Sequence, residues 1–149
     1  MRTAAPMKVQ VVFDAAEPRR LAEFWALALG YTEQPPPDGF DSWEDFGRSI
    51  GMPEEQWGDR AAVVDPSGAG PRIYFQRVPE GKTAKNRCHL DIEAGAASGS
   101  DDPHVRRAAR DAHVNLLAHH GGQVLRYLDE PGGSCVVMAD PEGNEFCVA

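Results

Sequence analysis

The stretch KVQVVFDAAEPRRLAEFWALALG, residues 8–30, predicts a strand followed at once by a helix. Its first part, Lys8–Ala16, is rich in valine, which favours extended backbone. Pro18 suits a first helical position, and Gly30 suits a helix end. Between them the apolar residues recur at the i, i+3, i+4 spacing of an amphipathic helix: Leu21, Phe24, Trp25, Ala28 and Leu29. One face of this helix is therefore expected to pack on a sheet.

The chain continues with a short strand near Tyr31–Gln34, and then with strands over Ala61–Val64 and Arg72–Val78. Between them, Ser42–Trp57 is expected to form a short helix or a tight loop. The first half thus reads strand, helix, strand, strand, strand.

The same order of elements returns after the polar segment that ends at Arg87. We expect a strand over Cys88–Ala94, a flexible loop over Gly95–Ser100, and a helix opened by the Asp102 cap and Pro103. Three further strands complete the half; they pass through Val124 and Leu125, Ser134–Ala139 and Glu145–Val148. Corresponding positions lie at similar intervals, 79 residues from Gln10 to His89 and 75 from Asp65 to Asp140.

An internal duplication explains this order. It predicts an α+β fold of two βαβββ modules, residues 7–79 and 86–149, joined by a linker over 80–85 and preceded by a disordered tail over 1–6. Two curved mixed sheets would then leave a cup-shaped cleft between them.

Composition excludes several classes of function. Of 149 residues, 15 are Lys or Arg and 23 are Asp or Glu, so the net charge of −8 opposes binding to nucleic acid or to an anionic membrane. The sequence has no membrane-length apolar run, no apolar segment typical of a signal peptide and no paired cysteine motif, which favours a cytoplasmic protein with reduced thiols. It also lacks the GxSxG, GxGxxG and P-loop motifs of hydrolases, dinucleotide-binding proteins and NTPases.

Strand alternation selects candidate polar residues. His89, Asp91 and Glu93 would share one face, with Leu90 and Ile92 on the other. His89 is a candidate general base or ligand, and Glu93 is its candidate partner; the alternative is a histidine satisfied by a backbone carbonyl. Gln10, Val12 and Asp14 would likewise share one face, which gives Gln10 the same cleft-facing role; the alternative is an ordinary polar strand residue.

Aromatic residues gather in the part of the first half that is not repeated. Trp43, Phe46 and Trp57 lie there and are candidates for a lid or a wall that stacks a flat ligand, although they could also serve to pack the insertion itself. Arg72 and Arg77 are candidates for pairing with an anionic ligand, with contact to water as the alternative.

The duplicated pattern resembles the vicinal oxygen chelate superfamily, also called the glyoxalase, bleomycin-resistance and dioxygenase superfamily. Three segments carry the resemblance to its glyoxalase-like domain proteins: EPRRLAEFWALALG, residues 17–30; WEDFGRSIGMPEEQWGDRAAVVDPSGAGPRIYFQRVPEGKTAKNRCHLDI, residues 43–92; and DPEGNEFCV, residues 140–148. The resemblance covers nearly the whole chain. It implies the two-module fold, a cleft bordered by the fourth strand of each half, and a homodimer.

Metal enzymes of this superfamily place one ligand on the first and one on the fourth strand of each half. The matching positions here are Gln10, His89, Cys147 where the family usually has a glutamate, and Tyr74 or Gln76, with the register of that strand left open. With both carboxylates absent, the resemblance implies a cleft without a metal cofactor. The alternative is Zn, Ni or Fe held by Gln10, His89 and Cys147.

The sequence therefore predicts a glyoxalase-like protein that binds a small aromatic or amphipathic molecule, as in sequestration or resistance. The expected ligand-binding residues are Gln10, Trp43, Trp57, Tyr74, Gln76 and Cys147. Were the protein an enzyme, His89 and Glu93 would be its catalytic residues. The alternative function is a metal-dependent lyase, isomerase or dioxygenase, and a third is a protein-interaction module whose cleft is filled by its own side chains.

Overall fold

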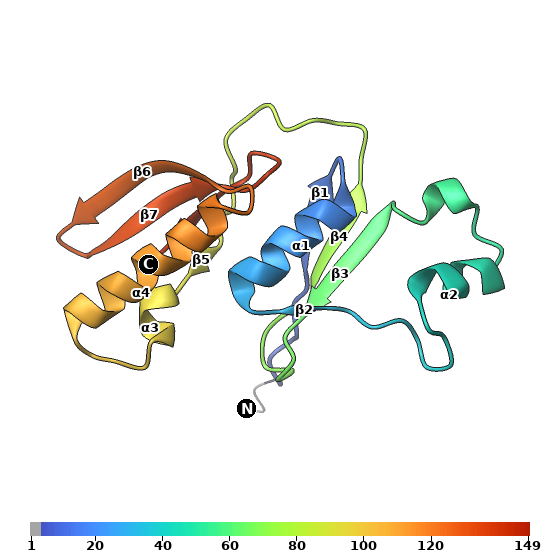
Figure 1. The fold of residues 1–149 in the computed structure, drawn as a ribbon, viewed down its shortest axis with the longest axis horizontal. Helices are drawn as coiled ribbons and strands as arrows, with labels where there is room; N and C mark the ends of the chain where they lie inside the picture. Colours follow the sequence, from blue (N-terminus) through green and yellow to red (C-terminus); the bar gives the residue numbers. More distant parts are fainter. Residues whose placement is uncertain (1–3) are drawn as a thin grey trace. The chain divides into compact units, whose positions relative to one another are not determined.

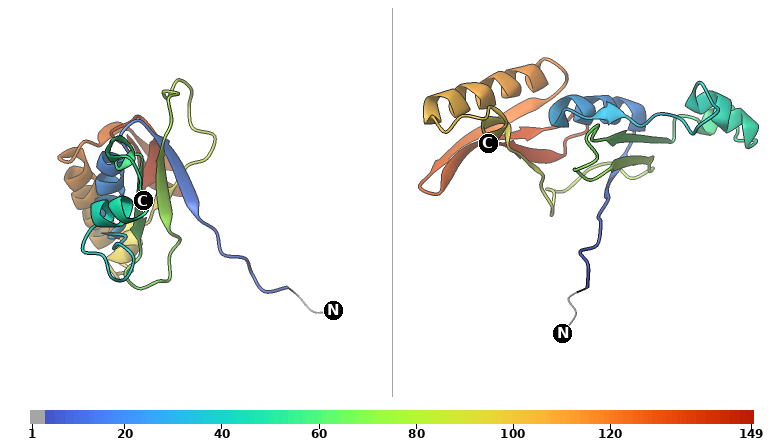
Figure 2. Two further views of the ribbon diagram at one scale, coloured as in Figure 1. Left: turned by 90° about the vertical axis from the view of Figure 1, so that its right-hand side faces the viewer. Right: turned by 90° about the horizontal axis from the view of Figure 1, so that it is seen from below.

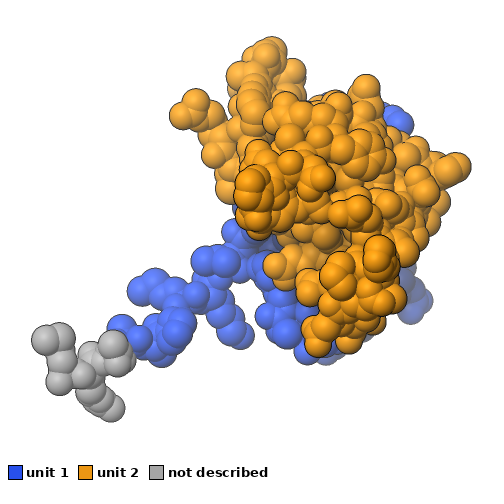
Figure 3. All heavy atoms as spheres, turned by 90° about the vertical axis from the view of Figure 1, so that its left-hand side faces the viewer, with its two compact units in different colours: residues 1–26, 30–79 blue, residues 27–29, 80–149 orange. Residues whose placement is uncertain are grey.

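The computed structural model describes residues 4–149. The predicted disordered tail over 1–6 therefore lies partly outside the described residues, while residues 4–10 contain no helix or strand and extend away from the first sheet (Figure 2). The chain divides into two compact units, residues 1–26 with 30–79 and residues 27–29 with 80–149 (Figure 3). We call them unit 1 and unit 2.

Unit 1 has a four-stranded mixed sheet in the order β1-β4-β3-β2, in which β1 and β4 are parallel and the other pairs are antiparallel. Its elements (Figure 1) are β1 (Val11–Ala15), α1 (Pro18–Leu29), β2 (Thr32–Glu33), α2 (Trp43–Ser49), the short 3-10 helix η1 (Glu54–Gln56), β3 (Arg60–Val64) and β4 (Ile73–Arg77). The last residues of α1, 27–29, group with unit 2.

The apolar face of α1 packs on one face of this sheet (Figure 2). Leu21 and Trp25 are fully buried, and the ring of Phe13 on β1 lies 5.0 Å from that of Trp25 and 5.5 Å from that of Phe75 on β4. Because side chains alternate along a strand, Tyr74 lies on the opposite face of β4 from Phe75. One face of the sheet is thus core, and the other is available for a site.

Unit 2 repeats this topology in the sheet order β5-β8-β7-β6, with β5 and β8 parallel. Its elements are β5 (Asp91–Ile92), α3 (Ala94–Ala97), α4 (Pro103–Ala118), β6 (Gln123–Glu130), β7 (Gly133–Ala139) and β8 (Glu145–Val148). Its core is formed by buried residues of α4, β7 and β8: Val114, Leu117, Val136, Met138, Phe146 and Val148. No helix within residues 4–149 has the length and apolar character needed to cross a membrane.

The predicted α+β class and the two βαβββ modules are confirmed, with Pro18 opening α1 and the Asp102 side chain capping α4 through the N–H of His104 at 2.9 Å. The first strand is shorter than the predicted Lys8–Ala16. It begins at Val11, whose register partner on β4 is Ile73, the first residue of that strand. The cup-shaped cleft between the modules stays a prediction.

The prediction of a strand over Cys88–Ala94 followed by a flexible loop over Gly95–Ser100 was wrong in part. The strand is reduced to β5, Asp91–Ile92, and the helix α3, which begins at Ala94, ends it early. Alanines favour a helix there, and the buried Gly95 lets α3 approach α4 so closely that a Cβ at this position would lie 3.1 Å from the carbonyl oxygen of Arg106.

Candidate functional site

Unit 1 encloses a cavity of about 270 Å³ between β2, α2, η1, β3 and β4. Four aromatic side chains line it: Trp43, Phe46, Trp57 and Tyr74. Three of the predicted ligand-binding residues, Trp43, Trp57 and Tyr74, are therefore brought to one cavity although they are far apart in sequence. Phe46, which the sequence grouped with Trp43 and Trp57 as a candidate for the wall of a site, lines the same cavity.

The two tryptophans are held by hydrogen bonds at their polar edges. Ser42 caps α2 by accepting the N–H of Asp45 at 3.0 Å, which fixes the start of the helix at Trp43. The indole Nε1 of Trp43 donates to the carbonyl of Gln34 at 2.8 Å, and that of Trp57 donates to the carbonyl of Met52 at 3.2 Å. With both indole N–H groups satisfied by the protein, the rings offer apolar surface to a ligand.

A guanidinium lies beside these aromatic rings. Arg72 donates from Nε to Oε1 of Gln34 and from Nη1 to Oε1 of Gln10, both at 2.7 Å. Its Cζ is 5.2 Å from the ring centroid of Tyr74, a cation–π distance. Gln10, predicted as a ligand-binding residue or metal ligand, thus holds Arg72 in place in this structure.

Gln76 is positioned differently from Tyr74. Its amide donates to Oδ1 of Asp14 at 2.8 Å across the β1–β4 pair, and it is not among the residues that line the cavity. Arg77, the other predicted anion partner, pairs with Asp59 at 3.0 Å. Of the β4 residues, only Tyr74 lines the cavity, next to Arg72, which immediately precedes the strand.

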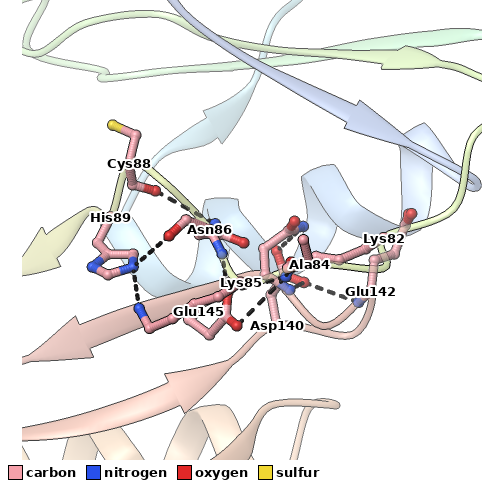
Figure 4. Close-up of polar contacts among 10 residues, drawn as sticks. Lys82, Ala84, Lys85, Asn86, Cys88, His89, Asp140, Glu142 and Glu145 are labelled. Atoms are coloured by element: carbon pink, nitrogen blue, oxygen red, sulfur yellow. Dashed lines mark hydrogen bonds and ion pairs between the residues drawn. The ribbon is translucent and has the colours of Figure 1, made fainter.

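Unit 2 contains a second cavity, of about 620 Å³, lined by residues of the connector before β5 and of β6, β7 and β8, with the turn before β8. Two predicted site residues line it. They are His89, a predicted catalytic residue or metal ligand, and Cys147, a predicted ligand-binding residue or metal ligand. Lys82, Lys85 and Glu145 line the same cavity and were not predicted as site residues (Figure 4).

Glu145 fixes the connector to β8 (Figure 4). Its carboxylate accepts the backbone N–H of Asn86 at 3.0 Å and pairs with Nζ of Lys82 at 3.2 Å. The hydrogen bond from Asn86, with the Lys82 ammonium as a further cause, lowers the pKa of Glu145 to about 2. The predicted linker over 80–85 is therefore anchored at Lys82. The DPEGN turn was the available signal, but counting from it led to Cys147 rather than to Glu145.

The donors around His89 do not fit a divalent cation. Its Nε2 lies 2.9 Å from Nζ of Lys85 and 3.2 Å from the carbonyl oxygen of Asn86, so an ammonium is in contact with the nitrogen that would bind a metal (Figure 4). Burial, together with Cys135 and Asp91 nearby, raises the pKa of the Cys147 thiol to about 11, so without a metal this side chain is a neutral thiol. Within residues 4–149, no group of three or more His, Cys, Asp or Glu side chains could hold a metal ion.

Glu93 lies apart from His89 within unit 2. It lines a third cavity, of about 370 Å³, together with Arg106, Arg110 and Ser134 near the start of α4. The structure therefore does not bring the two predicted catalytic residues to one cavity.

Two four-stranded mixed sheets in repeated βαβββ order are a fold that this chain shares with solved structures of the glyoxalase, bleomycin resistance and dioxygenase class. The chain belongs to the glyoxalase-like domain family, whose model matches residues 10–149. A comparison with curated proteins finds no significant match.

Solved structures of the superfamily share the fold at low sequence identity. A glyoxalase/bleomycin resistance protein/dioxygenase family enzyme from Burkholderia phytofirmans PsJN has a TM-score of 0.58 at 14% identity, covering 93% of this chain and 94% of that one. The fosfomycin resistance protein FosX from Mesorhizobium loti has a TM-score of 0.60 at 10% identity, covering 97% and 91%. A bleomycin-binding protein from Streptomyces verticillus has a TM-score of 0.53 at 17% identity, covering 99% and 98%.

Proposed function

We propose that this glyoxalase-like protein binds a small aromatic or amphipathic molecule in the cavity of unit 1, as a binding or sequestering protein. The observation that carries the proposal is the convergence of Trp43, Trp57 and Tyr74 on one cavity of about 270 Å³. Small-molecule sites are concave and mostly apolar, with a few polar groups that fix orientation, and this cavity has that composition.

The aromatic lining supports a flat ligand rather than an extended polar one. Large rings held in place by hydrogen bonds at their edges give contact area at low entropic cost, because few side-chain torsions are left to fix on binding. The bleomycin-binding protein, which shares the fold, is a precedent for small-molecule binding by this architecture.

We further propose that binding needs no metal. The ammonium of Lys85 in contact with His89 and the raised pKa of the Cys147 thiol support this part of the proposal. A homodimer and a cytoplasmic location stay predictions from the sequence. Light scattering of the purified chain tests the first of these.

Calorimetric titration with naphthamide, a neutral flat molecule, tests the proposed function. We expect binding to the wild-type protein that is unchanged after dialysis against EDTA. Trp43→Leu and Trp57→Leu are each expected to weaken it about tenfold, since removing a stacking ring from a desolvated contact costs on the order of 1 kcal/mol.

Tyr127→Leu is the matched control, because Tyr127 is an exposed aromatic residue of unit 2 that does not line the cavity of unit 1. Its affinity for naphthamide should equal that of the wild type. An affinity unaffected by both tryptophan substitutions, or abolished by EDTA, would contradict the proposal.

A further inference from the structure

Arg72 is fixed by neutral partners. Nε and Nη1 each donate to an amide oxygen, of Gln34 and Gln10, at 2.7 Å, and the guanidinium lies over the ring of Tyr74. These contacts orient the planar group but carry no formal negative charge. Its Nη2 makes no hydrogen bond within the part of the chain that the structure describes, so donor capacity remains on the half-buried guanidinium.

Two other arginines near the cavity, Arg19 and Arg48, are neutralised by carboxylates. Arg19 pairs with Glu44 at 2.8 Å, and Arg48, whose Cζ lies 4.8 Å from the Trp57 ring, pairs with Asp45 at 2.8 Å. No carboxylate within residues 4–149 pairs with Arg72. A half-buried cation without a counter-charge is costly, and a bound anion would offset that cost.

The residues that line the cavity have the opposite charge balance from the whole chain. Acidic residues outnumber basic ones, 23 to 15, in the sequence. Three arginines, Arg19, Arg60 and Arg72, line the cavity, against one acidic residue, Glu33. A cationic lining inside an acidic protein concentrates anions locally.

We propose that the ligand of the unit 1 cavity is an aromatic anion, a carboxylate or a similar oxyanion, whose charged group is received by Arg72 while its ring contacts Trp43 and Trp57. This inference rests on the proposed function and names its ligand class. The forked guanidinium matches the two oxygens of a carboxylate, and Gln10 and Gln34 keep it in position before the ligand arrives.

The test compares naphthoate with naphthamide, which have the same ring system and differ in charge. We expect the wild-type protein to bind naphthoate about tenfold more tightly than naphthamide, since a charge-assisted hydrogen bond is roughly twice as strong as a neutral one. Arg72→Met should remove this preference while leaving naphthamide affinity within about twofold. Arg72→Lys should keep part of it, because lysine retains the charge but not the fork.

Two further variants locate the anion. Arg77→Met is the matched control, because Arg77 ends the strand that begins just after Arg72, pairs with Asp59 and does not line the cavity. Lys85→Met removes the ammonium beside His89 in the cavity of unit 2. Both should retain the preference for naphthoate.

The outcomes separate the two proposals. Naphthamide binding without a preference for naphthoate overturns the anionic ligand and leaves the proposed function standing. Absence of binding by both compounds overturns the proposed function itself. A preference lost in Lys85→Met but kept in Arg72→Met would move the anion to unit 2 and overturn the inference. Unaltered naphthamide affinity in Arg72→Met serves as the check that this variant is folded.

Discussion

Substituting Glu145 by Gln should destabilise unit 2 in a manner that depends on pH. The amide keeps an acceptor for the N–H of Asn86 but loses the charge that pairs with Lys82 at 3.2 Å. The pKa of Glu145 is lowered from 4.5 to about 2, and counting this shift in full at about 1.4 kcal/mol per unit gives roughly 3 kcal/mol. Solvent reaches both side chains, 18% of Glu145 and 21% of Lys82, so we expect about 1 to 2 kcal/mol at pH 7.

The sign of the pH dependence follows from a carboxyl pKa that folding lowers. The stabilisation is fully present above the unfolded value of 4.5 and is lost as the pH falls through about 2. With these two pKa values, roughly 40% of the stabilisation remains at pH 3. The difference between wild type and Glu145→Gln should therefore shrink steadily between pH 5 and pH 3, and not above pH 5.

Urea unfolding followed by far-ultraviolet circular dichroism measures this difference. Tryptophan fluorescence would be misleading, because Trp25, Trp43 and Trp57, the three tryptophans of the chain, all belong to unit 1. Glu80→Gln, at an exposed glutamate near the start of the same connector, is the control and should match the wild type. A Glu145→Gln protein as stable as the wild type at pH 7, or one whose deficit is the same at pH 3, would refute the reasoning.

Two other predictions concern the cysteines and the wall of the unit 1 cavity. Burial raises the pKa of Cys147 to about 11, so at pH 8 iodoacetamide should label the exposed Cys88 well before Cys147. Peptide mass spectrometry measures the two labelling rates. Rapid labelling of Cys147 would contradict its protonated state. Gly47→Ala would place a Cβ 2.9 Å from Nε1 of Trp57, which should displace the indole, cost about 1 to 3 kcal/mol and weaken naphthamide binding. The Trp57 indole N–H resonance reports the displacement, and an unshifted resonance with unchanged affinity would count against it.

Long, regularly patterned segments were predicted well because their signal is local. The helices α1 and α4 each combine a proline at the first helical position with an apolar stripe, and both form as expected. The four residues of α3 have no such pattern. They become helical where Gly95 packs against α4 and donates its N–H to the carbonyl of Ala149 at 2.8 Å, contacts that sequence spacing cannot reveal.

The residues of the candidate site likewise fall into those that the local sequence predicted and those that depend on tertiary contacts. Trp43 and Trp57 were identified because aromatic residues outside a repeated core are unusual, and they do line a cavity. The roles of Arg72 and Glu145 depend on partners distant in sequence, such as Gln10 for Arg72 and Lys82 for Glu145, and no local pattern predicts such pairs.

The sequence by itself determined the duplicated βαβββ order and the family resemblance, since these depend on periodicity and on which residue types are present. The tertiary structure decided which face of β4 borders a cavity, which neutral partners hold Arg72 beside it, and which charge is in contact with His89. Those properties depend on distances between residues that are remote along the chain, and only folding fixes them.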